Sequence, residues 1–224
     1  MGSVKNILIV TPTHTGSIFA ECVTSLMIGM KVLNEGGIKT TFACIMGEAY
    51  VPMAKNKAVN LLYENKEYDS LMIVDYDLQF NPVAMGRLVL AEKDIVGGTF
   101  PFKCGKDGYP GTINIDSDMT AVTNESGLVS SSFVPGGFIL IKRHVFETIE
   151  SKCSIKTDNG IRFFFDTGFL FPDDHRWYGE DKTFCRRSID AGFELWIEPN
   201  ITFKHVGLSG RTGNYREYLS RNNM

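Results

Sequence analysis

Close cysteine pairs are missing from this sequence. Its five cysteines are an odd number, lie far apart and include no Cys-x-x-Cys pair. A disulfide-stapled fold or a cysteine zinc site needs paired or clustered cysteines, so this pattern argues against both. We expect reduced thiols, most of them packed in the core.

Long apolar runs and basic clusters are also missing. No apolar run reaches the ~18 residues of a membrane-spanning helix, and residues 6–10 are too short for a signal-peptide core. Lys and Arg number 23 and Asp and Glu number 26, which gives a net charge of −3, and the longest basic run is Arg186-Arg187. These absences predict a soluble, cytoplasmic protein without a membrane span or a nucleic-acid partner.

The chain lacks the two common glycine-rich nucleotide signatures, Gly-x-Gly-x-x-Gly and Gly-x-x-x-x-Gly-Lys-Ser/Thr. A dinucleotide site or a P-loop is therefore disfavoured. What remains is an ordinary globular composition, 43% hydrophobic and 22% charged, in a chain long enough for one sizeable domain. The polar turn Thr11-Pro12-Thr13 follows the first apolar run, and its hydroxyl and amide groups are suited to hold a base or a ribose.

Apolar periodicity predicts a regular alternation of strands and helices. The expected strands are residues 5–10, 38–46, 71–74, 94–100, 138–141 and 194–198, and the expected helices are residues 17–35, 52–65, 82–92, 144–152 and 182–191. This order predicts a single α/β domain over residues 1–207, with a mixed, mostly parallel central sheet and helices on both faces. Residues 103–132 are expected as hairpins or a loop, and residues 208–224 as a polar tail that frays.

The most informative stretch is residues 70–80, where an apolar run stops at two carboxylates one residue apart. Residues 71–74 are typical of a strand buried on both faces, so Asp75 lies where that strand leaves the core. Strand alternation is expected to place Asp75 and Asp77 on one side, with Tyr76 pointing away. Ligands of α/β sheets bind at this edge, and carboxylates hold Mg²⁺ or Mn²⁺ together with substrate phosphates. The stretch predicts a site for a metal and a diphosphate; a solvated turn is the alternative.

Charged residues at two predicted helix starts suit the same site. Lys55-Asn56-Lys57 is expected in the first turn of its helix, where the macrodipole disfavours cations unless an anion docks there. Solvated lysines are the alternative at that position. Glu180 and Asp181 open a later helix, where capping alone also explains them.

Two smaller motifs and a histidine complete the candidate residues. Gly136-Gly137 precedes an apolar strand and lets the backbone approach a ligand closely, although a tight turn explains it too. Trp177-Tyr178 precedes the two acids and offers either an aromatic face for a sugar or core packing. His205 ends an apolar stretch and is a ligand only if the fold returns it to the aspartates.

Taken in this order, the motifs resemble the pattern of GT-A glycosyltransferases over about residues 4–207. The matching motifs are the nucleotide turn Thr11-Pro12-Thr13, the basic helix start Lys55-Asn56-Lys57, the Asp-x-Asp motif Asp75-Tyr76-Asp77, the glycine pair Gly136-Gly137, the acidic helix start Glu180-Asp181 and the late His205. The resemblance implies a single Rossmann-like GT-A domain. It is strongest to the N-terminal glycosyltransferase domain of chlorovirus-encoded enzymes, which implies a viral protein of the host cytosol.

The resemblance also implies an activity and residue roles. The implied enzyme is a metal-dependent hexosyltransferase that moves a sugar from a nucleotide-sugar, foremost a UDP-hexose, to a hydroxyl group of a glycan. The implied roles are nucleotide binding for Thr11, Pro12, Thr13, Lys55, Asn56, Asp75, Tyr76 and Asp77, metal binding for Asp75, Asp77 and His205, acceptor binding for Gly136, Gly137, Trp177 and Tyr178, and catalysis for Asp181 with Glu180 as the second acid. His205 tilts the metal preference from Mg²⁺ toward Mn²⁺, because imidazole suits transition metals.

Three other functions fit parts of the same sequence. A phosphatase of the haloacid dehalogenase type also has Asp-x-Asp after a strand, but on its first strand and with Thr or Val where Gln79 stands here. A sugar nucleotidyltransferase shares the fold but needs a glycine-rich, basic loop after the first strand, which residues 11–16 do not supply. A non-catalytic module that binds a sugar nucleotide or a glycan stays open, and metal-dependent hydrolysis of a UDP-sugar would separate it from an enzyme.

Overall fold

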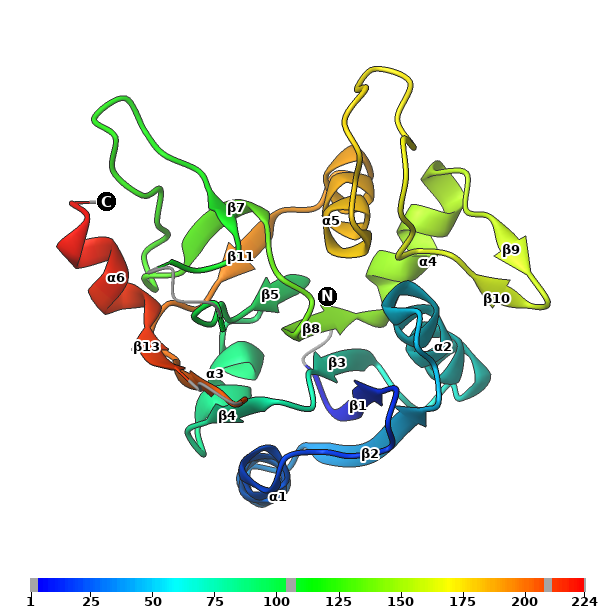
Figure 1. The fold of residues 1–224 in the computed structure, drawn as a ribbon, viewed down its shortest axis with the longest axis horizontal. Coiled ribbons are helices and arrows are strands. Elements are labelled where there is room, and N and C mark those ends of the chain that lie inside the picture. Colours follow the sequence, from blue (N-terminus) through cyan, green and yellow to red (C-terminus); the bar gives the residue numbers. More distant parts are fainter. Residues whose placement is uncertain (1–3, 104–107, 208–210, 224) are drawn as a thin grey trace.

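The computed structural model describes residues 4–103, 108–207 and 211–223 of the chain. Its centre is an eight-stranded sheet in which six strands run in one direction and two, β7 and β8, run against them (Figure 1). The strands across the sheet are, in order, β2 (Lys39–Met46), β1 (Asn6–Thr13), β3 (Ser70–Val74), β8 (Phe138–Lys142), β5 (Ile95–Gly97), β11 (Leu195–Ile197), β7 (Val129–Phe133) and β6 (Thr112–Ile113). The predicted mixed, mostly parallel α/β sheet is confirmed.

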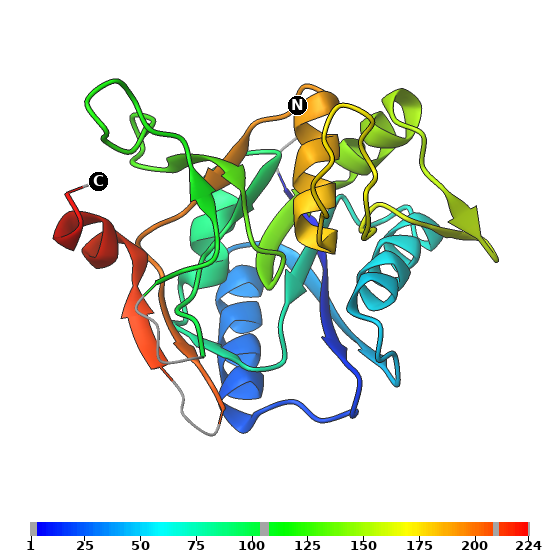
Figure 2. The same ribbon diagram turned by 45° about the horizontal axis from the view of Figure 1, so that its top comes forward.

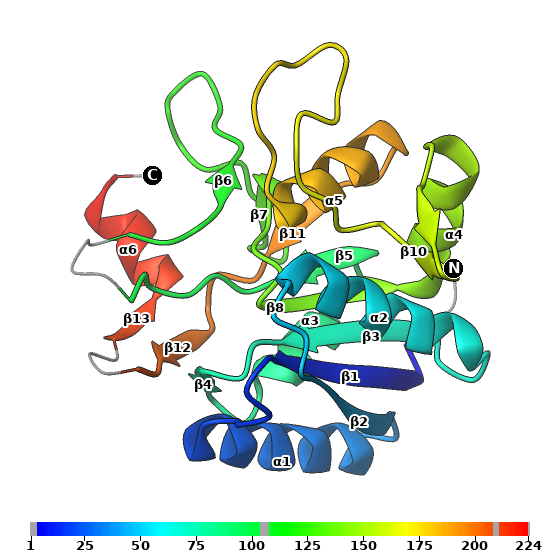
Figure 3. The same cartoon turned by 45° about the vertical axis from the view of Figure 1, so that its right-hand side comes forward.

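Helices cover both faces of this sheet. One face carries α1 (Ala20–Glu35) and α3 (Ala84–Leu90), and the other carries α2 (Val51–Glu64), α4 (Arg143–Lys152) and α5 (Glu180–Asp190). Figure 3 shows α1 and α2 on opposite sides of β1 and β3. Side chains alternate along a strand, so Ile7 and Ile9 of β1 join the apolar layer of α1, whereas Leu8 and Val10 join that of α2.

Phenylalanine side chains fill the layer beneath α4 and α5. The ring centroids of Phe165 and Phe184 lie 4.7 Å apart, and Phe146 lies 5.1 Å from Phe164. All four side chains are buried, and each contributes roughly 1.5 to 3 kcal/mol by leaving water. A short hairpin, β9 (Thr157–Asp158) and β10 (Ile161–Arg162), leads into this cluster beside α2. The cluster therefore fixes where α5 begins, and α5 begins with the acids of the predicted site.

The stretch between β5 and β7 forms irregular hairpins over its described residues, as its content of Gly, Asp, Ser and Thr predicts. β6 pairs with β7 across a register shift, and bridges join Ile115 to Ala121 and Thr123 to Val129. The hairpins end in β7, which pairs with β11 near the edge of the central sheet.

A second sheet is not evident from the sequence. It consists of β4 (Leu78–Phe80), β12 (Thr202–His205) and β13 (Arg211–Asn214). Antiparallel pairing of β4 with β12 sets His205 opposite Leu78, and the Val206 N–H donates to the Asp77 carbonyl at 2.7 Å. This sheet therefore returns His205 to the end of β3.

The expectation of a fraying tail after residue 207 is wrong for the residues that the structure describes. The chain adds β13 and then α6 (Tyr215–Arg221), whose N-cap Asn214 accepts a hydrogen bond from the Glu217 N–H at 3.2 Å. Tyr215 and Leu219 are buried, and the Tyr215 ring lies 5.2 Å from that of Tyr109. Figure 2 shows α6, in red, beside the green segment that precedes β7. One apolar face one turn long is enough to dock this helix.

The four cysteines that the structure describes are all free, and two of them are buried. Cys22 and Cys185 are buried, and burial raises the pKa of each thiol to about 12, so both are inert. Cys44 and Cys153 are half-buried and free, and Cys104 lies outside the described residues. Within residues 4–103, 108–207 and 211–223, no helix has the length and apolar character that crossing a membrane requires.

The docked C-terminal helix yields a first prediction. Leu219→Ala should lower the free energy of unfolding by about 2 to 4 kcal/mol, because Leu219 is only 2% exposed. Leu90→Ala is the matched control, since Leu90 also lies in a seven-residue helix but is 82% exposed. Urea unfolding followed by circular dichroism measures both. Equal stability of the two variants would mean that α6 does not dock.

Candidate functional site

β3 delivers Asp75 to the edge of the sheet. Residues 70–74 are fully buried and the strand ends at Val74, after which the Asp75 N–H donates to the Gly137 carbonyl at 2.7 Å. The chain then turns, with the Leu78 N–H 3.3 Å from the Asp75 carbonyl. Strand alternation therefore stops before Asp77. The expected shared face of Asp75 and Asp77 is wrong, and the two acids have different neighbours.

Asp75 lies in a charged and partly buried environment. Burial raises the pKa of its carboxyl group to about 6, the charges of Asp77 and Asp181 raise it as well, and Lys55 opposes them. An acid perturbed in this way at the wall of a cleft is typical of a functional site. Its position at the carboxyl end of a parallel strand is also where α/β sheets bind ligands.

Asp77 is 5% exposed and presents its two oxygens to different groups. Oδ2 accepts a hydrogen bond from the Lys103 ammonium, whereas Oδ1 faces His205 Nε2 at 3.5 Å and has no hydrogen-bond partner among the described residues. The other ring nitrogen, Nδ1, lies 2.8 Å from the Pro101 carbonyl oxygen. A carbonyl can only accept, so Nδ1 donates to it, and Nε2 is the ring nitrogen that faces Asp77.

These facing atoms fit a divalent cation. Ligands lie about 2.1 Å from such a cation, so two of them are about 3 to 3.5 Å apart, in agreement with the 3.5 Å observed. Carboxylate oxygen and imidazole nitrogen are a suitable donor set for Mn²⁺. No group of three or more His, Cys, Asp or Glu side chains in the described part of the chain could hold a metal. Further ligands would have to come from a substrate diphosphate and water.

Lys55 joins α2 to α5 through a buried ion pair. Its Nζ lies 2.5 Å from Asp181 Oδ1 and 3.2 Å from Glu180 Oε1. α2 begins at Val51, so Lys55 lies in the second turn and the expectation of a cation in the first turn is wrong. Burial alone would lower the pKa of Lys55, but Asp181, Asp75 and Glu180 together raise it, and the ammonium stays charged.

Two glycines let the backbone approach these charged groups. The Gly136 N–H donates to Asp181 Oδ2 at 2.9 Å. A Cβ at Gly136 would overlap Asp181 and lie 2.8 Å from the Lys55 Nζ, and a Cβ at Gly137 would overlap Asp75 Oδ2. The glycine pair therefore allows the acids of two distant segments to pack against one loop, a role that the sequence does not reveal.

A cleft of ≈ 410 Å³ opens between the turn after β1, the start of α2 and the start of α5. The predicted site residues in its lining are Pro12, Thr13, Lys55, Asp75, Tyr76, Gly137, Glu180 and Asp181. Phe100, Phe102 and Phe133 add apolar surface to the same lining. The fold thus brings the acid at the end of β3 and the two acids of α5 into one hollow.

Three residues that were predicted to bind the nucleotide, Thr11, Thr13 and Asn56, have buried side chains, and two of them form hydrogen bonds within the fold. The Asn56 side chain is fully buried, donates to the Phe165 carbonyl at 2.6 Å and accepts from the Phe165 N–H at 2.9 Å. Asn56 therefore holds the segment after β10, and the geometry gives it no nucleotide contact. Thr11 is fully buried without a partner for its hydroxyl among the described residues, and the Thr13 hydroxyl donates to the Ser17 carbonyl at 2.7 Å.

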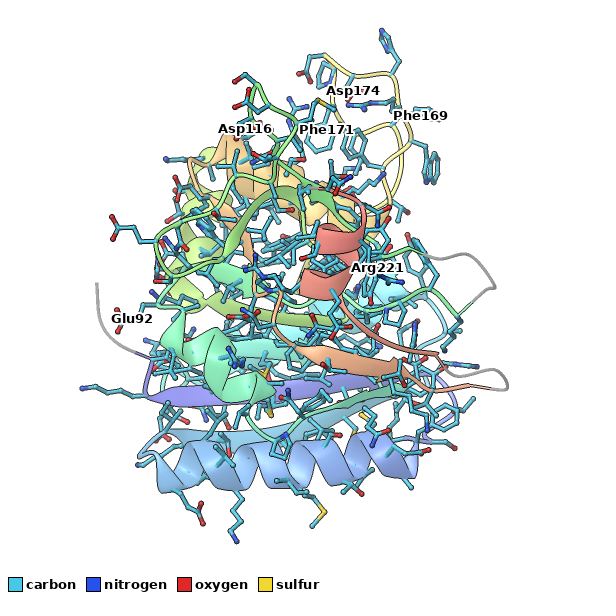
Figure 4. The ribbon with its side chains drawn as sticks, turned by 90° about the vertical axis from the view of Figure 1, so that its left-hand side faces the viewer. Glu92, Asp116, Phe169, Phe171, Asp174 and Arg221 are labelled. Atoms are coloured by element: carbon cyan, nitrogen blue, oxygen red, sulfur yellow. The ribbon has the colours of Figure 1, made fainter. Side chains whose placement is uncertain are left out.

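The two expected acceptor aromatics differ in their exposure. Trp177 is 62% exposed, and its ring centroid lies 5.3 Å from that of the exposed Phe169. Tyr178 is buried, and its hydroxyl donates to Asp174 at 2.6 Å. Figure 4 shows Phe169 and Asp174 on the loop at the opposite end of the molecule from α1. Trp177 and Tyr178 line a second hollow of ≈ 290 Å³, which shares Phe133 with the cleft.

Sequence reasoning missed two charged residues of the site, Lys103 and Glu48. Glu48 lines the cleft and pairs with Lys57 at 2.8 Å, and Lys103 contacts Asp77. Both follow the carboxyl end of a strand that runs parallel to β3, β2 for Glu48 and β5 for Lys103. A search for charged residues after every such strand, and not only after the Asp-Tyr-Asp strand, would have found them.

Comparison with known proteins gives a likeness in fold. No family model matches the chain, and no curated protein matches it. A197 from STIV has a similar structure, with a TM-score of 0.57 at 16% identity over 90% of this chain and 86% of that one. A mutant of Drosophila β-1,4-galactosyltransferase 7, in complex with manganese, UDP-Gal and xylobiose, has a TM-score of 0.53 at 16% identity over 91% and 71%. The structural neighbours thus include a glycosyltransferase, and the chain has a GT-A-like fold.

The expected likeness to a chlorovirus enzyme stays a prediction. A glycosyltransferase involved in the glycosylation of the major capsid of PBCV-1 has a TM-score of 0.36 at 10% identity, over 63% of this chain and 62% of that one. A score this low carries no weight for or against the expected relationship.

The close packing at the glycine pair yields a second prediction. Gly137→Ala should destabilise the protein by about 1 to 3 kcal/mol, because the new Cβ would overlap Asp75 Oδ2 and lie 2.7 Å from Phe100 Cζ. Gly86→Ala in α3 is the control, since its Cβ would meet nothing within 4 Å and should stabilise by about 0.5 to 1 kcal/mol. Thermal unfolding measures both, and a Gly137→Ala variant as stable as the parent would contradict this packing.

Proposed function

We propose that this protein is a metal-dependent glycosyltransferase that moves a hexose from a UDP-sugar to a hydroxyl group of a glycan. One observation carries the proposal. The fold brings Asp75 and Asp77, with His205 facing Asp77, to the sheet edge beside the cleft that receives Glu180 and Asp181. Transfer from a nucleotide diphosphate needs a cation-binding acid and a second acid for the acceptor. The GT-A-like fold supports the same function.

The charge of the site supports metal dependence. Four carboxylates, those of Asp75, Asp77, Glu180 and Asp181, are accompanied by the ammonium groups of Lys55 and Lys103. Without counting His205, this leaves two negative charges before a diphosphate brings more. A divalent cation held by Asp77 and His205 would reduce this repulsion and, as a Lewis acid, neutralise the leaving diphosphate.

The donor is proposed to lie in the cleft of ≈ 410 Å³, with its diphosphate toward Asp77. This volume is within the range of about 300 to 1,000 Å³ that is usual for small-molecule sites. Pro12 and Thr13 line the cleft as the last two residues of β1, so the turn expected at residues 11–13 is wrong, and Tyr76 lines the cleft from the turn after β3. We assign the base and ribose to the end of β1 and the turn that follows it.

Asp181 is proposed as the base that receives the acceptor proton. Lys55 contacts one of its oxygens and the Gly136 N–H the other, so the carboxylate is fixed in orientation while each oxygen keeps a lone pair. In the transfer, the acceptor oxygen bonds to the anomeric carbon, the bond from that carbon to the diphosphate breaks with its electron pair, and the acceptor proton passes to the carboxylate. Help of this kind contributes about 10²- to 10⁴-fold.

The acceptor is proposed to bind in the second hollow, beside Trp177. The exposed ring of Trp177 offers an apolar face to a sugar, and Phe133 connects this hollow to the cleft. Gly136 and Gly137 lie at the junction through their contacts with Asp181 and Asp75. An acceptor held there would present its hydroxyl group to the start of α5.

The donor and metal assignment gives a third prediction. UDP should bind in the presence of Mn²⁺ more tightly than GDP, and Asp77→Asn should abolish the metal-dependent part of UDP binding. The control is Asp158→Asn, which changes an exposed acid of the β9–β10 hairpin. Isothermal titration calorimetry with and without Mn²⁺ measures all three proteins. Tighter GDP binding would overturn the choice of uridine, and parental binding by Asp77→Asn would overturn the metal site.

The assignment of the base gives a fourth prediction. Asp181→Asn should reduce transfer by at least about 10²-fold at saturating donor while the dissociation constant of UDP with Mn²⁺ stays nearly unchanged. Glu180→Gln should leave most of the rate and chiefly raise KM for the acceptor. The measurement is transfer rate from the best donor found in a screen of nucleotide-sugars. A near-parental rate for Asp181→Asn together with a large loss for Glu180→Gln would move the role to Glu180.

A further inference from the structure

Lys103 is held at Asp77 by contacts from two segments, the turn after β3 and the backbone at Gly207. Its ammonium forms an ion pair with Asp77 Oδ2 and lies 6.0 Å from the centre of the Tyr76 ring. Its aliphatic stem passes the backbone of Gly207, where a Cβ would lie 3.7 Å from Lys103 Cδ and Cε. The side chain is still 41% exposed. It is therefore placed by its surroundings and remains free to turn outward.

The ammonium occupies a position that a metal at Asp77 would compete for. A carboxylate as buried as Asp77 is costly without a compensating charge, and Lys103 supplies one through a charge-assisted hydrogen bond. His205 is a less direct partner, because its Nε2 lies 3.5 Å from Asp77 Oδ1 and that oxygen has no hydrogen-bond partner among the described residues. Lys103 is thus the cation that hydrogen-bonds Asp77 before a divalent cation binds.

We propose that Lys103 is a place-holder for the metal, and that a divalent cation must displace its ammonium from Asp77 in order to bind. This inference rests on the proposed function, because it concerns the same cation. A cation that arrives alone would meet the ammonium as a like charge at the same carboxylate. A cation that arrives with a diphosphate brings anionic oxygens, which give the displaced ammonium a new partner. Metal and nucleotide should therefore bind cooperatively.

The backbone next to Lys103 would allow its side chain to leave Asp77 while the proposed metal ligands Asp77 and His205 stay in place. The Pro101 carbonyl, two residues earlier, accepts from His205 Nδ1 at 2.8 Å and so anchors both the imidazole and the segment. Phe102, between them, lines the cleft where the donor is proposed to bind. Rotation of the Lys103 side chain alone would clear Asp77 and move the ammonium away without disturbing His205.

The test compares Mn²⁺ binding by the parent protein and a Lys103→Gln variant, followed by the electron paramagnetic resonance signal of free Mn²⁺. Without nucleotide, Lys103→Gln should bind Mn²⁺ about tenfold more tightly, because a charged competitor is gone. With UDP present the gain should be smaller, since the parent has then already released its ammonium. Lys103→Arg keeps the cation and should bind Mn²⁺ as weakly as the parent.

Lys204→Gln is the matched control. Lys204 is 40% exposed, nearly the same as Lys103, and neighbours His205, but it pairs with Glu21 at 3.6 Å and not with Asp77. This variant should bind Mn²⁺ like the parent. A second readout is the melting temperature: without metal, Lys103→Gln should melt below the parent, and saturating Mn²⁺ should raise its melting temperature more than that of the parent.

The outcomes separate this inference from the proposed function. Parental or weaker Mn²⁺ binding by Lys103→Gln, with binding still lost in Asp77→Asn, overturns the place-holder and leaves the metal site intact. A gain in Lys204→Gln equal to that in Lys103→Gln also overturns it, since the effect would then be one of general charge. Absence of Mn²⁺ binding by every variant, with and without UDP, overturns both the place-holder and the proposed metal dependence.

Discussion

The ion pair of Lys55 with Asp181 and Glu180 is the interaction on which the rest of the site depends. It joins residues more than a hundred positions apart in the chain and fixes the start of α5 against α2. A buried ammonium is tolerated only when its partners compensate for the water it loses. Here two acids share one lysine and Asp75 lies within range of the same charge, so the cleft stays negative after Lys55 is neutralised. That remaining charge suits the proposed binding of a divalent cation.

The direction of β8 explains how these groups meet. Parallel strands such as β3 and β5 end at the same edge of a sheet, and an antiparallel strand placed between them begins there. Gly136 and Gly137 precede β8 and therefore reach the edge at which Asp75 leaves β3. A side chain on either glycine would overlap an acid, so backbone groups contact the acids instead: the Gly136 N–H donates to Asp181, and the Gly137 carbonyl accepts from the Asp75 N–H. The β4–β12 pairing then adds His205 to the same edge from the end of the chain.

Local pattern was sufficient for most of the central sheet, for its helices and for the order of the motifs along the chain, but not for the second sheet or α6. Strand and helix periods depend on neighbouring residues, and the sheet, its helices and the acids at its edge follow from them. The hydrogen-bond and ion-pair partners of a side chain depend on tertiary packing, and the periodicity of the sequence carries no information about that packing. The Asn56 side chain could bind a nucleotide but forms hydrogen bonds with the Phe165 backbone. Lys55 lies in the second turn of α2, whereas the sequence predicted the first turn. α6 is too short for its two apolar contacts to form a visible pattern.

Charge compensation explains why the predicted acid Asp77 lies beside a lysine, Lys103, that the sequence did not reveal as part of the site. An acid placed to bind a cation is uncompensated whenever the cation is away, and a buried position makes this costly. The pKa of the Asp75 carboxyl group is raised, so this group holds its proton more readily, whereas Asp77 forms an ion pair with the Lys103 ammonium. The two acids of one motif thus meet the same problem in two ways, because Lys103 is hydrogen-bonded to Asp77, whereas the lysine near Asp75, Lys55, is paired with Asp181 and Glu180. A motif search sees two equivalent carboxylates, but their different neighbours make Asp77, with His205 opposite its unpaired oxygen, the point at which a metal and a diphosphate would meet.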